Sequence, residues 1–405
     1  MIDMYVLKDV IENLKNGEFV IVFDSQNRED EADLILPAQF STPDKISFVL
    51  NHAKGMFCVA IDKEIQRRLN LYVPYNTQDS CAFTVTVDHK DTKTGITAIE
   101  RSKTSKELAN PNAMASDFKI PGHVNPVVAH EGGVLTRKGH TEAAVELCRI
   151  SKLFPAAVMI EILDEKGDSH NKEYVKSLAK KFSIPITTID EIEKYILLNQ
   201  PTVQKEAEAD LPTQYGKFKI FAFKNHFSQK EHAVLINQTF NPSQPVNVRI
   251  HSSCKTGDVF HSLRCDCHQQ LEFFLQFMAE NKNCMLIYLD QEGRGIGFAN
   301  KIKAYAFQEQ GFDTYEANNL LGFDDDLRDY FDALHILRFF GISKINLATS
   351  NPEKVSFLQD CGIEILKRIS IPIVINPYNR KYIHSKILKK KHEILIKGEG
   401  VFENF

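Results

Sequence analysis

The sequence predicts two separate layered domains of the α/β (α+β) class, each a mixed sheet with packed helices. A chain of 405 residues is long enough for two domains of about 200 residues each. In both halves, short apolar runs typical of strands alternate with segments of helical periodicity. A polar stretch without periodicity separates the halves, so we place the domains at 1–200 and 211–405 and a linker at 201–210.

The first half contains apolar runs and period-two patterns that predict strands. Residues 19–23 are wholly apolar and lead into an acidic loop, which indicates a buried strand. Residues 83–87 alternate apolar and threonine side chains, which indicates a half-buried strand. A strand over 157–163 follows a predicted helix over 140–151, and 180–196 predict one more strand and helix.

The second half continues the alternation, and no internal repeat relates it to the first. Apolar runs predict strands near 217–223, 232–237, 246–251, 284–289 and 344–349. Helical spacing predicts helices near 269–280, 298–310 and 327–340.

Composition excludes several classes of protein. No run of 18 apolar residues is present, so we expect no membrane span, and residues 1–15 lack the apolar core of a signal peptide. We therefore expect a cytoplasmic protein. The net charge of −4 gives no general attraction to nucleic acid, so an anionic ligand must be held by local basic clusters.

Three of the eight cysteines gather between Cys254 and Cys267, with Cys265 between them. Clustered cysteines in an intracellular chain indicate metal binding more than disulfides. Three thiolates bind zinc and leave a fourth position for a reactive water molecule. This spacing favours an open catalytic zinc site. A closed structural site completed by His261 or His268, and a cluster without metal, are the alternatives.

A glycine-rich turn at 290–297 joins a predicted strand to a predicted helix. Such turns present free backbone N–H groups to anions. Arg294, Lys301 and Lys303 add positive charge suited to a triphosphate. The turn taken alone is equally compatible with a tight connection flanked by solvated lysines.

The first half carries two segments that suit a sugar phosphate and a divalent cation. Carboxylates crowd the loop 24–33 at the end of a strand, which is costly unless they are solvated or share a hard cation. In segment 132–144, Arg137 and a glycine precede a helix N-terminus, a suitable phosphate cradle, and His140 is a candidate metal ligand. An exposed acidic loop is the alternative interpretation.

The second half resembles GTP cyclohydrolase II over residues 211 to about 380. The resemblance is carried, in order, by the cysteine cluster and by the motifs at 291–297, 303–306, 313–318, 321–328 and 349–354. It implies a zinc-dependent enzyme that opens GTP to a diaminopyrimidinone ribosylamino phosphate, formate and pyrophosphate, with zinc on Cys254, Cys265 and Cys267.

The same resemblance assigns roles to individual residues. Tyr305 would position a water molecule and Asp326 would accept a proton. Arg328 would be either a nucleophile toward the α-phosphate or a stabiliser of phosphate charge, because guanidinium stays protonated far above neutral pH. The implied GTP contacts are Arg249, Ile250, His251, Ser252, Ser253, Gln270, Glu292, Gly293, Arg294, Thr314, Thr349 and Lys354.

The first half resembles 3,4-dihydroxy-2-butanone 4-phosphate synthase over about 5–200, through the two segments above and the motifs at 82–85, 94–101 and 121–124. The resemblance implies conversion of ribulose 5-phosphate with loss of formate. Glu29 and His140 would hold magnesium, or manganese, and His123 and Glu161 would transfer protons. The implied substrate contacts are Arg28, Asp33, Arg137, Lys138, Gly139 and Thr141.

The chain departs from both families at a few positions. Ser253 replaces a glutamate, and Phe331–Asp332 interrupt a glycine-rich turn. In the first half, the departures from the synthase pattern are Ser25, Gln26, Asp30, Ala32, Lys138 and Val128.

The favoured interpretation is a bifunctional riboflavin biosynthesis enzyme, and a homodimer is expected because both families form one. The alternatives are a GTP cyclohydrolase II with an inactive, structural synthase-like half, and a zinc module that binds nucleic acid. The last would need a closed four-ligand site and a basic, aromatic surface.

Overall fold

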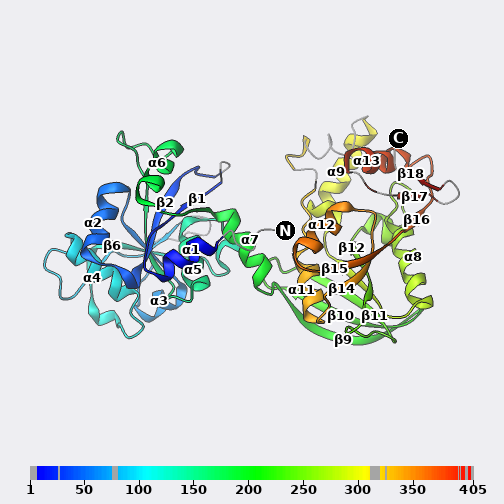
Figure 1. Ribbon diagram of the computed structural model, residues 1–405, viewed down its shortest axis with the longest axis horizontal. Helices are drawn as coiled ribbons and strands as arrows, with labels where there is room; N and C mark the ends of the chain where they lie inside the picture. Colours follow the sequence, from blue (N-terminus) through cyan, green and yellow to red (C-terminus); the bar gives the residue numbers. More distant parts are fainter. Residues whose placement is uncertain are drawn as a thin grey trace. The chain divides into compact units, whose positions relative to one another are not determined.

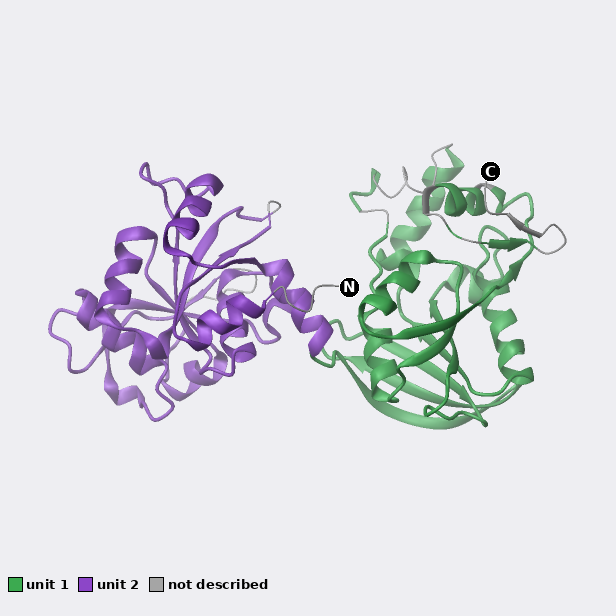
Figure 2. Ribbon diagram, in the orientation of Figure 1, with its two compact units in different colours: residues 1–2, 200–405 green, residues 3–199 purple. Residues whose placement is uncertain are grey.

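The computed structural model describes residues 7–25, 28–74, 81–310, 320–323, 326–390, 392, 394–396 and 400–402. Residues 3–199 form one compact unit and residues 200–405 belong to another, coloured purple and green in Figure 2. Two layered domains were predicted, and the structure confirms them. Among the described residues, no helix combines the length and the apolar character that a membrane span requires.

The N-terminal unit is built on a mixed sheet surrounded by helices (Figure 1). The strand order is β4-β6-β3-β7-β2-β1-β8, with β5 paired to β6. Its strands are β1 Val20–Phe23, β2 Ala32–Pro37, β3 Cys58–Ile61, β4 Ala82–Phe83, β5 Val87–His89, β6 Phe118–Val128, β7 Ala156–Glu161 and β8 Ile186–Thr188. Its helices are α1 Lys8–Lys15, α2 Pro43–His52, α3 Lys63–Arg68, α4 Ala98–Leu108, α5 His140–Ile150, α6 Lys172–Phe182 and α7 Ile189–Asn199.

Helices cover both faces of this sheet because successive strand residues point to opposite sides. Ile21 packs with apolar side chains of α2, α4 and α6. Val20 and Val22 pack with those of α1, α5 and α7. The wholly apolar run at 19–23 is therefore a strand buried on both faces, as predicted.

The strand predicted over 83–87 is interrupted. β4 and β5 both pair with β6, but Phe83 lies opposite Val127 and Val87 lies opposite Val124. Thr84 still donates its backbone N–H to the Pro126 carbonyl at 3.0 Å, and the pairing has shifted by one residue when it resumes at Val87. Alternation alone could not reveal this break, because it depends on how β6 pairs.

The C-terminal unit contains a sheet with strand order β15-β14-β12-β13-β11-β10-β9. Its strands are β9 Val203–Thr213, β10 Gly216–Asn225, β11 Glu231–Asn237, β12 Val246–Ser252, β13 Cys284–Leu289, β14 Lys344–Ala348 and β15 Glu364–Ile369. A small second sheet holds β16 Pro372–Ile373, β17 Ile394–Ile396 and β18 Gly400–Phe402. The helices are α8 Cys267–Glu280, α9 Phe298–Glu309, α11 Phe331–Phe339, α12 Pro352–Asp360 and α13 Arg380–Lys390.

The predicted linker is largely a strand in the structure. β9 covers 203–213 and pairs antiparallel with β10 along its length. It is an exposed edge strand, and its polar, charged side chains give no apolar periodicity in the sequence. The Glu208 carboxylate joins β9 to β10 through ion pairs with Lys205 and Lys219.

The larger sheet positions the candidate site. β15, β14, β12 and β13 are mutually parallel, and β11, β10 and β9 follow antiparallel. Cys254, the turn at 290–297 and Thr349 follow the ends of the parallel strands β12, β13 and β14. Ligands of α/β folds bind at this carboxyl edge, so the predicted residues converge there.

Two candidate active sites

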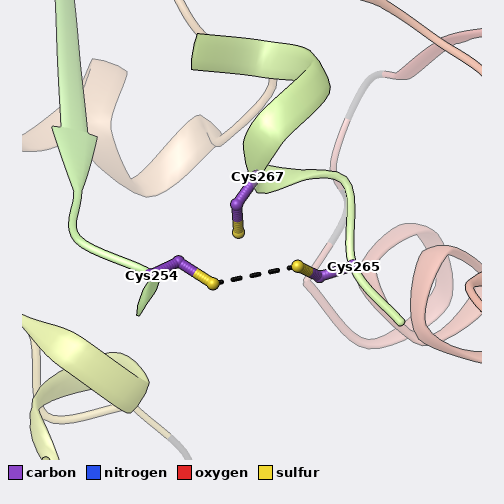
Figure 3. Close-up of side chains that lie close together, drawn as sticks. All are labelled: Cys254, Cys265 and Cys267. Atoms are coloured by element: carbon purple, nitrogen blue, oxygen red, sulfur yellow. Dashed lines mark hydrogen bonds between the residues drawn. The ribbon is translucent and has the colours of Figure 1, made fainter. Parts of the chain in front are cut away.

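The three clustered thiols of the C-terminal unit converge at the carboxyl edge of the sheet (Figure 3). Cys254 follows β12 and Cys267 begins α8. The Sγ atoms of Cys254 and Cys265 are 3.8 Å apart, and all three lie within 4.8 Å of one another. Two thiolates at about 2.3 Å from a tetrahedral zinc ion are about 3.8 Å apart, so this donor set fits zinc.

The proposed fourth histidine ligands lie elsewhere. The rings of His261 and His268 stack on each other with centroids 3.8 Å apart. In the described part of the chain, the group of ligand atoms within 4.8 Å comprises the three thiols and no histidine. This arrangement favours an open zinc site over a closed one.

A largely buried lysine adjoins the thiols. Lys301 Nζ lies 3.0 Å from Cys254 Sγ and 2.8 Å from Glu292 Oε1. Hydrogen bonds from the Cys265 and Cys267 thiols lower the pKa of Cys254, and the Lys301 ammonium lowers it further. Lys301 therefore contacts Cys254 and Glu292, whereas the sequence suggested that its charge would bind a triphosphate. Lys303 is exposed.

A cavity of about 350 Å³ opens beside the cysteines. Tyr305 lies on its wall, with its hydroxyl 3.4 Å from Thr256 Oγ1 and the Arg264 guanidinium carbon 4.8 Å from its ring centre. Other lining residues that the sequence predicted are Ser252, Ser253, Gly293, Arg294 and Arg328. The cavity therefore opens directly onto the three cysteines, which form part of its wall.

A smaller, more polar cavity of about 70 Å³ adjoins the first. The predicted residues on its wall are Arg249, His251, Ser252, Gln270, Arg294, Asp326, Arg328, Thr349 and Lys354. Arg249 donates to Gln270 Oε1 at 2.6 Å, and Lys354 Nζ donates to the Ile250 carbonyl at 2.8 Å. With Lys386, five lysine and arginine side chains line this small cavity, which suits the charges of a triphosphate.

The predicted catalytic pair Asp326 and Arg328 is in direct contact. Arg328 Nε donates to Asp326 Oδ1 at 2.8 Å, and both side chains are largely buried. Burial lowers the pKa of Arg328, but the Asp326 carboxylate raises it more, so the net pKa lies above its usual range. The guanidinium therefore holds its proton.

The remaining predicted positions lie along the same edge. Glu292 accepts from the Lys255 backbone N–H at 2.6 Å. Gly293, Gly295 and Gly297 adopt positive φ, which explains why this turn is rich in glycine. Ser253, at the position of a family glutamate, accepts from the Gln291 backbone N–H at 3.1 Å. Thr314 lies outside the described residues.

The N-terminal unit gathers a second set of ligands at the end of β1. Ligand atoms of Asp24, Glu29 and His140 lie within 4.8 Å of one another. Asp24 also shapes the loop, because it accepts from the backbone N–H groups of Glu29 and Glu31 at 3.1 and 2.9 Å. Glu29 and His140 were predicted as ligands and Asp24 was not, although it is the first carboxylate after the strand.

Two acidic side chains line the same sheet edge. Asp33 lies opposite Glu161 in the pairing of β2 with β7. Asp33 Oδ1 is buried and has no hydrogen-bond partner among the described residues, and His140 Nδ1 lies 4.0 Å from it. Burial raises the pKa of both carboxyls, and the charge of Asp33 raises that of Glu161 further. An unpartnered buried carboxylate oxygen beside these ligands suits a cation.

His123 reaches this edge from β6. Cys58 on β3 lies opposite Asn125 of β6 on one side and Met159 of β7 on the other. His123 and Glu161 each lie two residues from these partners in the same direction along the sheet, so they lie at the same level. His123 Nδ1 is 2.7 Å from Asp88 Oδ2. Asp88 was not predicted, and its only sequence signal is a carboxylate next to an apolar strand. Burial raises the pKa of Cys58 to about 12, so this thiol stays protonated.

The predicted phosphate cradle is a helix N-terminus flanked by basic side chains that are already paired with carboxylates. Gly139 caps the N-terminus of α5, and Thr141 is buried in its first turn. Arg137 is tied to the buried Glu142 carboxylate at 2.6 Å. Lys138 forms ion pairs with Asp190 and Glu193 of α7, which explains a lysine where the family has a smaller residue. Arg28 pairs with Asp24 at 2.9 Å and Glu29 at 2.6 Å.

Comparison with known proteins divides the chain between two families. Residues 8–195 match the family profile of 3,4-dihydroxy-2-butanone 4-phosphate synthase, and residues 204–370 match that of GTP cyclohydrolase II. The chain is 42% identical over 389 residues to the riboflavin biosynthesis protein RibBA of Bacillus cytotoxicus, covering 95% of this chain and 98% of the relative. The Bacillus cereus protein of that name gives the same identity and coverage.

A solved structure also resembles the chain. It is RibBX from A. baumannii, described as a two domain 3,4-dihydroxy-2-butanone 4-phosphate synthase. The TM-score is 0.60 and the sequence identity 26%, with 85% of this chain and 93% of that chain covered.

Proposed function

The chain belongs to the family of bifunctional riboflavin biosynthesis proteins, and from this premise we propose which residues perform each of its two reactions. It carries a 3,4-dihydroxy-2-butanone 4-phosphate synthase domain and a GTP cyclohydrolase II domain. The substrates that follow are ribulose 5-phosphate and GTP. Each reaction releases formate, which gives one assay for both.

In the C-terminal unit, Cys254, Cys265 and Cys267 would hold a zinc ion. Their mutual distances and the lysine beside Cys254 support this, since a nearby cation favours the thiolate form that binds zinc. When bound, the ion would lower the pKa of a water molecule and so supply a nucleophile for C8 of guanine at neutral pH. Tyr305 borders the same cavity and would orient water for the release of C8 as formate.

The triphosphate would occupy the smaller cavity. Arg249, Arg294, Arg328 and Lys354 line it, and their charge would offset that of the phosphates. We assign Arg328 to stabilisation of phosphate charge during release of pyrophosphate. Its protonated state, maintained by Asp326, is unsuited to nucleophilic attack.

In the N-terminal unit, Asp24, Glu29 and His140 would hold a magnesium or manganese ion. Two carboxylates and an imidazole suit such a cation, and the unpartnered oxygen of Asp33 adds a further acceptor. When bound, the ion would stabilise an enediolate formed from ribulose 5-phosphate. Glu161 and His123, oriented by Asp88, would move protons at the same sheet edge.

The observation that carries the assignment is the convergence of three thiols beside a cavity rich in arginine and lysine. The test is formate release by the purified protein, with GTP and ribulose 5-phosphate supplied separately in magnesium. Formate from both supports the bifunctional enzyme. Formate from GTP alone would mean that the departures from Ser25 to Lys138 have silenced the synthase half. We further propose that the protein is a cytoplasmic homodimer. Light scattering after gel filtration would test the number of chains in the assembly.

A further inference from the structure

The segment after residue 370 lies beyond the matched cyclohydrolase region, yet it is folded against the candidate site. Helix α13 packs Ile383 against Ile373, Ile394 and Ile396, which forms a small separate core. The segment is joined to α8 at Val374, whose backbone N–H donates to Gln269 Oε1 at 2.7 Å. The sequence suggested only a solvated lysine run near 389–391, whose side chains lie outside the described set.

A buried ion pair fixes α13 next to the cysteines. Lys386 Nζ lies 2.7 Å from Asp266 Oδ1, and Asp266 stands between the ligands Cys265 and Cys267. The exposed fractions of the two side chains are 11% and 1%. Asp266 also accepts from Gln270, which in turn accepts from Arg249. One chain of hydrogen bonds therefore runs from α13 to a predicted GTP contact.

Tyr382 occupies the junction of the two cavities. Both cavities are lined by Ser252, Cys267, Arg294, Arg328 and Tyr382. The Lys386 ammonium lies 4.6 Å and the Arg294 guanidinium 5.8 Å from the centre of the Tyr382 ring. A nucleotide with its base beside the cysteines and its phosphates in the polar cavity would pass this ring.

We propose that α13 completes the GTP site, with Tyr382 contacting the bound nucleotide where its base and triphosphate meet and Lys386 positioning α13 through Asp266. The inference rests on the proposed cyclohydrolase function. It adds two residues that lie outside the matched family region. Ser385 of the same helix also lines the larger cavity, which supports the proposal that this face of α13 borders the site.

The test uses the full-length zinc-loaded protein and the variants Tyr382→Ala, Tyr382→Phe, Lys386→Met and Lys386→Arg. His384→Ala is the matched control, because His384 is an exposed residue of the same helix. For Tyr382→Ala we expect KM for GTP to rise about tenfold, because one aromatic contact with the nucleotide is lost. The value of kcat should change much less. Tyr382→Phe and His384→Ala should stay near wild type. Lys386→Met should raise KM similarly, and Lys386→Arg should restore most of the loss.

Three readouts separate the outcomes. Formate release from ribulose 5-phosphate by the same chain reports the amount of folded N-terminal unit, and zinc content reports an intact cysteine cluster in the C-terminal unit. Unchanged KM in Tyr382→Ala would overturn the proposal, and so would zinc loss in that variant, which would make α13 a structural support only. If wild type releases no formate from GTP, the proposed function fails. In that case, the affinities of wild type and Tyr382→Ala for a GTP analogue with a methylene group bridging the α- and β-phosphates still test the contact at Tyr382.

Discussion

His232 Nε2 lies 2.8 Å from Asp332 Oδ2, and this largely buried pair links α11 to the turn of the candidate GTP site. The other ring nitrogen, His232 Nδ1, accepts the backbone N–H of Asp290, where that turn begins. Asp332 also accepts from Thr202 at 2.7 Å and Asn225 at 2.8 Å. The residue that interrupts the family's glycine-rich turn thus has a structural role in this chain.

Asp332→Ala should destabilise the C-terminal unit by about 3 kcal/mol, because it leaves His232 buried without its carboxylate partner. The measurement is chemical denaturation followed by circular dichroism. Asp210→Ala, at an exposed carboxylate of β9, is the control and should change stability very little. Equal stabilities for the two variants would contradict this role of Asp332.

Cys265→Ser should abolish zinc binding and formate release from GTP, because two thiolates and a hydroxyl bind zinc poorly. Formate release from ribulose 5-phosphate should remain within about twofold of wild type, since that site belongs to a separately folded unit. Zinc is measured by elemental analysis, and Cys361→Ser, outside the cluster, is the control. Full zinc content in Cys265→Ser would count against the three-thiol site.

Arg328→Lys should lower kcat/KM for GTP by about 10- to 100-fold, because lysine keeps the charge but loses the planar donor fork. No covalent nucleotide–enzyme adduct should appear in mass spectra of wild type quenched during turnover. Detection of a nucleotide attached at Arg328 would instead support the nucleophilic role.

Asp24→Asn should raise the magnesium concentration needed for half-maximal synthase activity by at least about tenfold. The amide retains the shape of the side chain but removes one negative charge from the cluster with Glu29 and His140. The assay is formate release from ribulose 5-phosphate over a magnesium titration. Glu64→Gln, at an exposed position of α3, is the control, and an unchanged titration in Asp24→Asn would exclude Asp24 as a ligand.

Glu31→Gln should move the acidic limb of synthase activity to lower pH. Burial, then the charges of Asp33 and Glu31, raises the pKa of Glu161, so this carboxyl becomes an available base only at a higher pH than usual. Removing the Glu31 charge lowers that pKa and extends activity toward acid. The measurement is kcat/KM for ribulose 5-phosphate against pH. A limb that stays in place would mean that Glu161 does not set it.

Much of the fold and of both sites was readable from local sequence. Apolar runs identified β1, β7 and β10 to β14, and helical spacing identified α5, α8 and α9 within a few residues. The candidate ligands Cys254, Glu29 and His140 were recognisable because motifs keep residue types at fixed spacing. The edge strand β9 and the break between β4 and β5 were missed, since neither leaves an apolar pattern of its own.

The sequence by itself therefore determined the two layered domains, the ligand types and the loops that carry them. Only the tertiary structure decided which side chains from distant parts of the sequence pair within each unit. Lys386 and Asp266 are 120 residues apart, and His232 and Asp332 are 100 apart. Periodicity reports whether a side chain faces core or solvent, whereas a contact between distant residues depends on strand order and register. For that reason Asp24, Asp88 and the role of α13 became visible only in the folded chain.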